Sequence, residues 1–131
     1  MPAPESYPDD LRYHRQHDWA RVEGDEATLG ITWFAQDSLG ELVHYEAPEQ
    51  GATVTRDTPY GEVESVKAVS DVIAPLSGEV VEVNAKVVDA PEIVNEEPYG
   101  DGWLIRIRLS DPSEVDALLD VDAYKQVVAE S

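Results

Sequence analysis

A single lysine, Lys67, interrupts the apolar, β-branched stretch GEVESVKAVSDVIAP of residues 61–75. Its strand-like part, residues 62–73, is about twice the roughly five to six residues of an ordinary strand. We therefore predict a hairpin that bends at Val66, Lys67 and Ala68, none of which is a usual turn residue. The amine at the tip is either an ordinary solvated charge or a nucleophile held out for covalent acylation.

Few other residues in the chain are of types and spacings that indicate reactive or metal-binding sites. The chain has no cysteine, so disulfides, thiolate metal sites and thiol nucleophiles are excluded, and any redox sulfur must come from a cofactor. His14 and His17 lie three residues apart without an evident third ligand, so we expect surface or hydrogen-bonded histidines rather than a metal site. Neither a glycine-rich phosphate loop nor a nucleophile elbow is present, which leaves Lys67 as the main candidate for chemistry.

The charge balance restricts the partners. With 28 acidic and nine basic residues, the formal net charge is -19, which disfavours nucleic acid and anionic lipid and favours partners with basic docking patches. The first ten residues lack the pattern of a secretory signal, and no stretch approaches the roughly 18 apolar residues of a membrane span. We therefore expect a cytoplasmic monomer that binds neither nucleic acid nor membranes.

Short strands dominate the rest of the chain. Its 131 residues fit one domain, which we place at residues 11–131, after a proline-rich, acidic and loose N-terminal arm at residues 1–10. A hairpin is indicated around Gly24 and Asp25. Further strand-like runs are bounded by proline and glycine, at residues 41–48, 52–59, 60–66, 68–75, 78–84 and 103–109. So many closely spaced strands predict a mainly β sandwich or barrel.

Helices are expected only at the periphery. Thr32 can cap a short helix that ends at Gly40, and residues 91–95 can form one helical turn within a longer loop. The tail is predicted to be helical, with Pro112 in its first turn. Its apolar stripe consists of Val115, Leu118, Leu119, Val121 and Tyr124.

The stretch GEVESVKAVSDVIAPLSGEVVEVN resembles the lipoyl-lysine hairpin of the H protein of the glycine cleavage system. Other stretches similar to the family occur in the family's order from about Leu11 to the C-terminus. They are HDWARVEGDEATLGIT, AQDSLGELV, NEEPYGDGWLIRI and LLDVDAYKQVV. The resemblance implies a barrel-sandwich hybrid fold of the lipoyl/biotinyl type, with lipoate amide-linked to Lys67.

The resemblance also implies a carrier without a catalytic centre of its own. In this family, the lipoyl group takes the aminomethyl group of glycine from a pyridoxal-phosphate glycine decarboxylase. An aminomethyltransferase passes the carbon to tetrahydrofolate, and dihydrolipoyl dehydrogenase reoxidises the dithiol with NAD. Lipoyl-attaching enzymes are the remaining implied partners.

Four further site residues follow from the resemblance. Glu64, three residues before Lys67, and Gly78, eleven after it, match positions that lipoyl-attaching enzymes read. Asp71 and Asp18 match acidic residues of a cleft that shields the loaded arm, where a carboxylate can accept hydrogen bonds from an ammonium group. Ordinary alternatives are a solvated strand residue for Glu64, a turn glycine with positive φ for Gly78, and surface positions for the two aspartates.

Alternative functions remain at this point. An H-like paralogue could act as a lipoyl relay or serve another pathway. A biotinyl carrier would have a similar hairpin, but biotin domains typically flank the lysine with methionines, whereas Val66 and Ala68 flank it here. The last alternative is an unmodified interaction module whose acidic face binds a basic partner.

Overall fold

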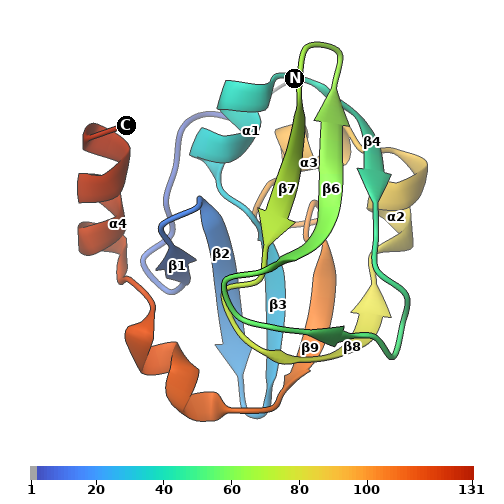
Figure 1. Ribbon diagram of the computed structural model, residues 1–131. Helices are drawn as coiled ribbons and strands as arrows, with labels where there is room; N and C mark the ends of the chain where they lie inside the picture. The colour runs from blue at the N-terminus through green and yellow to red at the C-terminus, as the bar shows by residue number, and fades with distance from the viewer. Residues whose placement is uncertain (1–2) are drawn as a thin grey trace.

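Two antiparallel β-sheets form the core of the computed structural model, which describes residues 3–131 (Figure 1). The larger sheet has the order β1 (Arg12–His14), β2 (Asp18–Glu23), β3 (Glu26–Ile31), β9 (Ile105–Leu109), β8 (Gly78–Val83) and β5 (Thr53–Val54). The smaller sheet has the order β4 (Leu42–Glu46), β6 (Pro59–Ser65) and β7 (Val69–Ile73). The prediction of a mainly β, barrel-sandwich fold is confirmed by this arrangement of two sheets.

The main hydrophobic core lies between the two sheets. Leu29 and Ile107 from the larger sheet and Val63 and Val72 from the smaller one are all buried in a single cluster. Because side chains alternate between the faces of a strand, the outward positions of the hairpin strands remain free for polar residues. A second cluster, built on Trp19, Tyr13 and Tyr124, lies against the C-terminal segment.

Turns and caps follow the residues expected to form them. Gly24 has a φ of 65° in the turn that joins β2 to β3. Helix α1 (Trp33–Leu39) begins after Thr32, whose hydroxyl accepts the N–H of Ala35, and it ends at Gly40 with a φ of 84°. No helix within residues 3–131 is long and apolar enough to cross a membrane.

The tail is helical, as predicted, but it does not form one continuous helix. The segment forms a 3-10 helix, η1 (Pro112–Ala117), and a separate helix, α4 (Val121–Ala129). Between them, the backbone of Leu119 exchanges two hydrogen bonds of 2.8 Å with Tyr13 of β1, and Asp120 caps α4. This sheet-like pairing takes Leu119 out of the helix, which the apolar stripe alone did not indicate.

Two other segments differ from expectation. Helix α2 (Ala85–Asp89), capped by Asn84, was not predicted and precedes the expected loop, whereas α3 (Ile93–Glu96) forms the helical turn expected within it. Residues 3–10, which were expected to form a loose arm, contact the fold at several points. Ala3 accepts a 2.7 Å hydrogen bond from the Trp33 indole, and Tyr7 packs edge-on against Tyr124. Contacts with aromatic side chains therefore hold this arm against the fold. Met1 and Pro2 lie outside the described residues.

Candidate functional site

Lys67 lies at the tip of the hairpin formed by β6 and β7, which protrudes at the top of the view in Figure 1. The backbone N–H of Ser65 donates to the carbonyl of Ala68 at 2.8 Å, and the N–H of Ala68 donates to the Ser65 hydroxyl at 3.2 Å. Val66 and Lys67 project beyond this closure, with Val66 89% exposed. Because the side chain of Ser65 helps to close the turn, no residue of the tip needs a positive φ.

The stem of Lys67 crosses the end of α1. A Cβ atom placed on Gly40 would lie 3.7 Å from the Cε of Lys67. No ion pair involves Lys67 within residues 3–131, and its side chain is exposed. The amine of Lys67 is therefore accessible from solvent.

A cavity of about 140 Å³ lies beside this crossing point, and sequence reasoning did not identify it. Gly40 lines it together with Asp37, Glu41 and Glu92. The buried side chain of Asn95 shapes the cavity, because its Nδ2 donates to the carbonyl of Gly40 and its Oδ1 accepts from the backbone of β4. Little in the sequence indicates that Asn95 shapes a cavity, since an asparagine in a short helix usually suggests a cap or a turn.

Glu64 and Asp71 share the hairpin with Lys67. Glu64 is exposed in β6 opposite Val69, and Asp71 is exposed in β7 opposite Glu62. The structure thus brings these two carboxylates into the same two-stranded element as the lysine.

Asp18 occupies a very different environment from Asp71. It is only 2% exposed at the start of β2, so the surface alternative is wrong for this residue. Its carboxylate accepts a hydrogen bond from the backbone of Ile73 in β7, while Oδ1 has no partner within the described residues. Burial raises the pKa of this carboxyl well above its ordinary range and outweighs the opposing effect of the Ile73 bond.

Tyr60 is a neighbour of Asp18 that sequence reasoning missed. Its hydroxyl is the other buried side-chain oxygen without a hydrogen-bond partner in residues 3–131. Tyr60 lies where the pairing of β6 with β7 shifts register, close to Ile73. Burial raises the pKa of its phenol, and the carboxyl of Asp18 adds to the effect. Two buried polar groups without hydrogen-bond partners among the described residues thus lie close together.

Gly78 lies apart from the hairpin, at the start of β8 in the larger sheet, where it pairs with Val54 and Leu109. A Cβ atom on Gly78 would come within 2.2 Å of the carbonyl oxygen of Arg108. The positive-φ alternative is therefore wrong, because the glycine is required by the close approach of a neighbouring backbone.

His14 and His17 both form hydrogen bonds. A ring nitrogen of His14 lies 2.7 Å from Asp57, and Nδ1 of His17 lies 2.9 Å from the hydroxyl of Tyr124. Among the described residues, no group of three or more metal-binding side chains comes together.

Comparisons with known proteins agree with this architecture. The family described as "Glycine cleavage H-protein" matches residues 11–131. The chain belongs to this family. H-proteins are the lipoyl carriers of the glycine cleavage system, and this carrier role is the function of the chain.

Similar proteins come from distant sources. The chain is 52% identical over 124 residues to the glycine cleavage system H protein of Brevibacillus brevis, covering 95% of this chain and 98% of that protein. It is 52% identical over 121 residues to a probable glycine cleavage system H protein of Haloarcula marismortui, covering 92% and 95%. The crystal structure of an H protein from Mycobacterium marinum matches with a TM-score of 0.87 at 40% identity, covering 94% and 99%.

Proposed function

We propose that this H-protein carries lipoate in an amide bond to Nζ of Lys67. The observation that carries the proposal is the position of this lysine, exposed at the tip of a closed hairpin and free of ion pairs within the described residues. Lipoate, when bound, would supply the redox disulfide that a chain without cysteine lacks. The chain's own contribution is to present, orient and shelter the arm.

Residues in and around the hairpin support this role. The hydroxyl of Ser65 fixes the turn, so the amine is presented in one pose. Gly40 leaves room for the stem of Lys67 against the end of α1. Glu64 and Gly78 are proposed as recognition residues for the attaching enzyme, Glu64 through its exposed carboxylate and Gly78 through the strand pairing it permits.

Asp71 and Asp18 are proposed to receive the positively charged amine of the aminomethyl cargo. The exposed carboxylate of Asp71 lies on the same hairpin as Lys67. Oδ1 of Asp18 is buried and unpartnered among the described residues, so it can accept a hydrogen bond from the ammonium group; burial raises the pKa of this carboxyl and favours its neutral form, and the arriving positive charge would favour the ionised form. Because Asp18 is only 2% exposed, the structure must open locally for the arm to reach it.

The partners proposed are the pyridoxal-phosphate glycine decarboxylase, the aminomethyltransferase, dihydrolipoyl dehydrogenase and lipoyl-attaching enzymes. Membership of the H-protein family supports this set, and the net charge of -19 favours partners with basic docking patches. We propose a monomeric, cytoplasmic carrier with no catalytic centre of its own.

The direct test is peptide mass spectrometry after incubation with lipoate, ATP and a lipoyl-attaching ligase. We expect a lipoyl-sized mass increment on the peptide that contains Lys67, complete loss of the increment in Lys67→Arg, and no loss in the matched variant Lys86→Arg. If a control H protein is modified and this chain is not, the proposal fails and an unmodified acidic interaction module takes its place. An increment with biotin and its ligase instead would identify a biotinyl carrier.

A further inference from the structure

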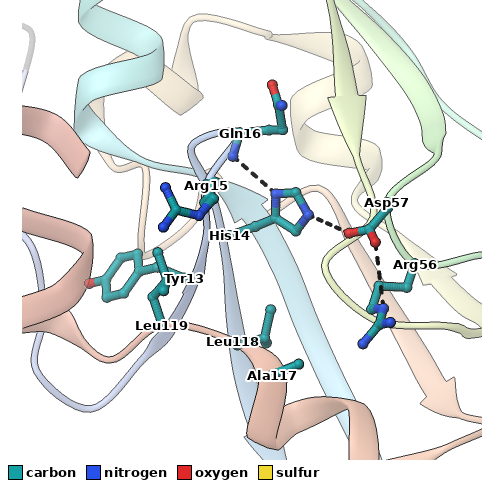
Figure 2. Close-up of a pocket in the computed structure, with 9 residues that line it drawn as sticks. All are labelled: Tyr13, His14, Arg15, Gln16, Arg56, Asp57, Ala117, Leu118 and Leu119. Carbon is teal, nitrogen blue, oxygen red and sulfur yellow. Dashed lines mark hydrogen bonds and ion pairs between the residues drawn. The ribbon is translucent and has the colours of Figure 1, made fainter. Parts of the chain in front are cut away.

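A second cavity, of about 350 Å³, lies between β1, the turn after β5 and the segment that follows η1 (Figure 2). Its polar side is formed by Arg15 and Arg56, which lie on either side of His14. Its apolar side includes Leu118 and Leu119. None of these residues belongs to the lysine hairpin.

The charge of this cavity is opposite to that of the molecule. Two of the chain's nine basic residues line it, against the single carboxylate of Asp57. Arg15 is exposed and forms no ion pair or side-chain hydrogen bond within residues 3–131. Arg56 is held only loosely, with its Nε 3.6 Å from Asp57. Both guanidinium groups therefore keep donors available to a ligand.

A rigid frame holds the polar side in place. The backbone N–H of Gln16 donates to Nδ1 of His14 at 3.0 Å, so the proton of the neutral ring lies on Nε2. That nitrogen then donates to Asp57 at 2.7 Å. Asp57 has a φ of 71°, and its own N–H donates to the carbonyl of Ala74 at 2.8 Å. Strained backbone of this kind persists where the surrounding contacts fix it, and it is frequent at binding sites.

We propose that this cavity binds a small organic anion, with a phosphate or carboxylate group held by Arg15 and Arg56 and an apolar body against Leu118 and Leu119. Guanidinium groups pair with both kinds of oxyanion through charge-assisted hydrogen bonds. A cavity of about 350 Å³ is large enough for a compact metabolite. The bound anion lies beside β1, so the site is independent of acylation at Lys67.

The test is a titration of the isotopically labelled full-length chain, followed by amide chemical shifts. The probes are phenyl phosphate and benzoate, which share an apolar ring, and benzamide, which has the same ring without the charge. We expect saturable shifts at Arg15, Gln16 and Asp57 with one of the two anions, with a Kd of about 1 mM or tighter. The anion that binds more tightly distinguishes a phosphate ligand from a carboxylate ligand.

Three variants assign the binding to the arginines. Arg15→Gln and Arg56→Gln should each raise the Kd by about fivefold to tenfold, because each removes charge-assisted donors. Arg108→Gln removes the same charge from an exposed position on β9 outside the cavity and should leave the Kd unchanged. Asp57→Asn keeps an acceptor for His14 and removes the competing carboxylate, so it should lower the Kd by about twofold to fivefold.

The proposal is overturned if neither anion gives saturable shifts, or if benzamide binds as tightly as the anions. It is also overturned if Arg108→Gln weakens binding as much as the two cavity variants, because the attraction would then be a general charge effect.

Discussion

Lys67 and Asp18 show how strongly position decides what a charged side chain can do. Lys67 is exposed on a hairpin tip, where its amine is hydrated and accessible. Asp18 is 2% exposed between the sheets, where burial raises its pKa and its Oδ1 has no partner among the described residues. We therefore propose the first residue as the site of modification and the second as an acceptor for the charged cargo.

Asp18→Asn tests the burial of this carboxyl through the pH dependence of stability. Because the pKa is raised in the folded protein, folding binds a proton, and stability is greatest below the unfolded pKa of about 4. Stability then falls as pH rises towards the folded pKa. Asparagine stays neutral, so the free energy of unfolding of the variant should gain on that of the natural chain as pH rises above about 4.

Urea unfolding at several pH values measures this difference. Asp71→Asn is the matched control, because it neutralises an exposed carboxylate and should show no comparable trend. A difference for Asp18→Asn that stays constant with pH would mean that Asp18 is not perturbed by burial.

At the scale of the elements, the hairpin turn depends on one side chain. Ser65→Ala removes the hydroxyl that accepts the N–H of Ala68 at 3.2 Å. We expect a loss of about 1 kcal/mol in the free energy of unfolding and faster amide hydrogen exchange at residues 66–68. Slower lipoylation at Lys67 should accompany the loosened tip. Unchanged exchange at the tip would show that the backbone pairing alone closes the turn.

Replacing Gly78 should disturb the pairing of β8 with β9 and destabilise the protein. In Gly78→Ala, the new methyl group would lie 2.2 Å from the carbonyl oxygen of Arg108, so the strands must separate. Denaturant unfolding should show a loss of about 2 to 3 kcal/mol. Gly100→Ala is the control, since its methyl group would first meet the flexible carboxylate of Glu97 at 3.1 Å and should cost much less. Equal losses in the two variants would contradict the close-approach explanation.

Local sequence signals predicted most of the elements, because their causes lie within a few residues. Thr32 and Gly40 mark both ends of α1, and Gly24 marks the first hairpin. The break between η1 and α4 was missed because its cause, the pairing of Leu119 with Tyr13, joins residues far apart in the chain.

The candidate site likewise combines features that the local sequence predicts with features that depend on tertiary packing. The hairpin and the position of Lys67 at its tip were predictable from a β-branched run with one lysine at its centre. The burial of Asp18 and its nearness to Tyr60 depend on how the two sheets pack together. No local pattern carries that information, and a polar residue at a strand end reads equally well as exposed.

At the scale of the whole molecule, the net charge of -19 on 131 residues should itself oppose folding through self-repulsion. Ion pairs offset little of this repulsion, because those within residues 3–131 are mostly exposed. Raising NaCl from about 20 to 500 mM shortens the Debye length and should increase the free energy of unfolding. Choline chloride at matched ionic strength should act similarly. A decrease in stability with both salts would mean that attractive charge pairs dominate.

We propose that this H-protein serves the glycine cleavage system through Lys67. The measurement that tests it most directly is glycine-dependent NADH production in a reconstituted system of the decarboxylase, aminomethyltransferase and dihydrolipoyl dehydrogenase, with the lipoylated chain as the only carrier. We predict turnover with the natural chain, none with the correctly folded Lys67→Arg variant, and normal turnover with Lys86→Arg. Retained turnover in Lys67→Arg, or none with the fully lipoylated natural chain, would contradict the account.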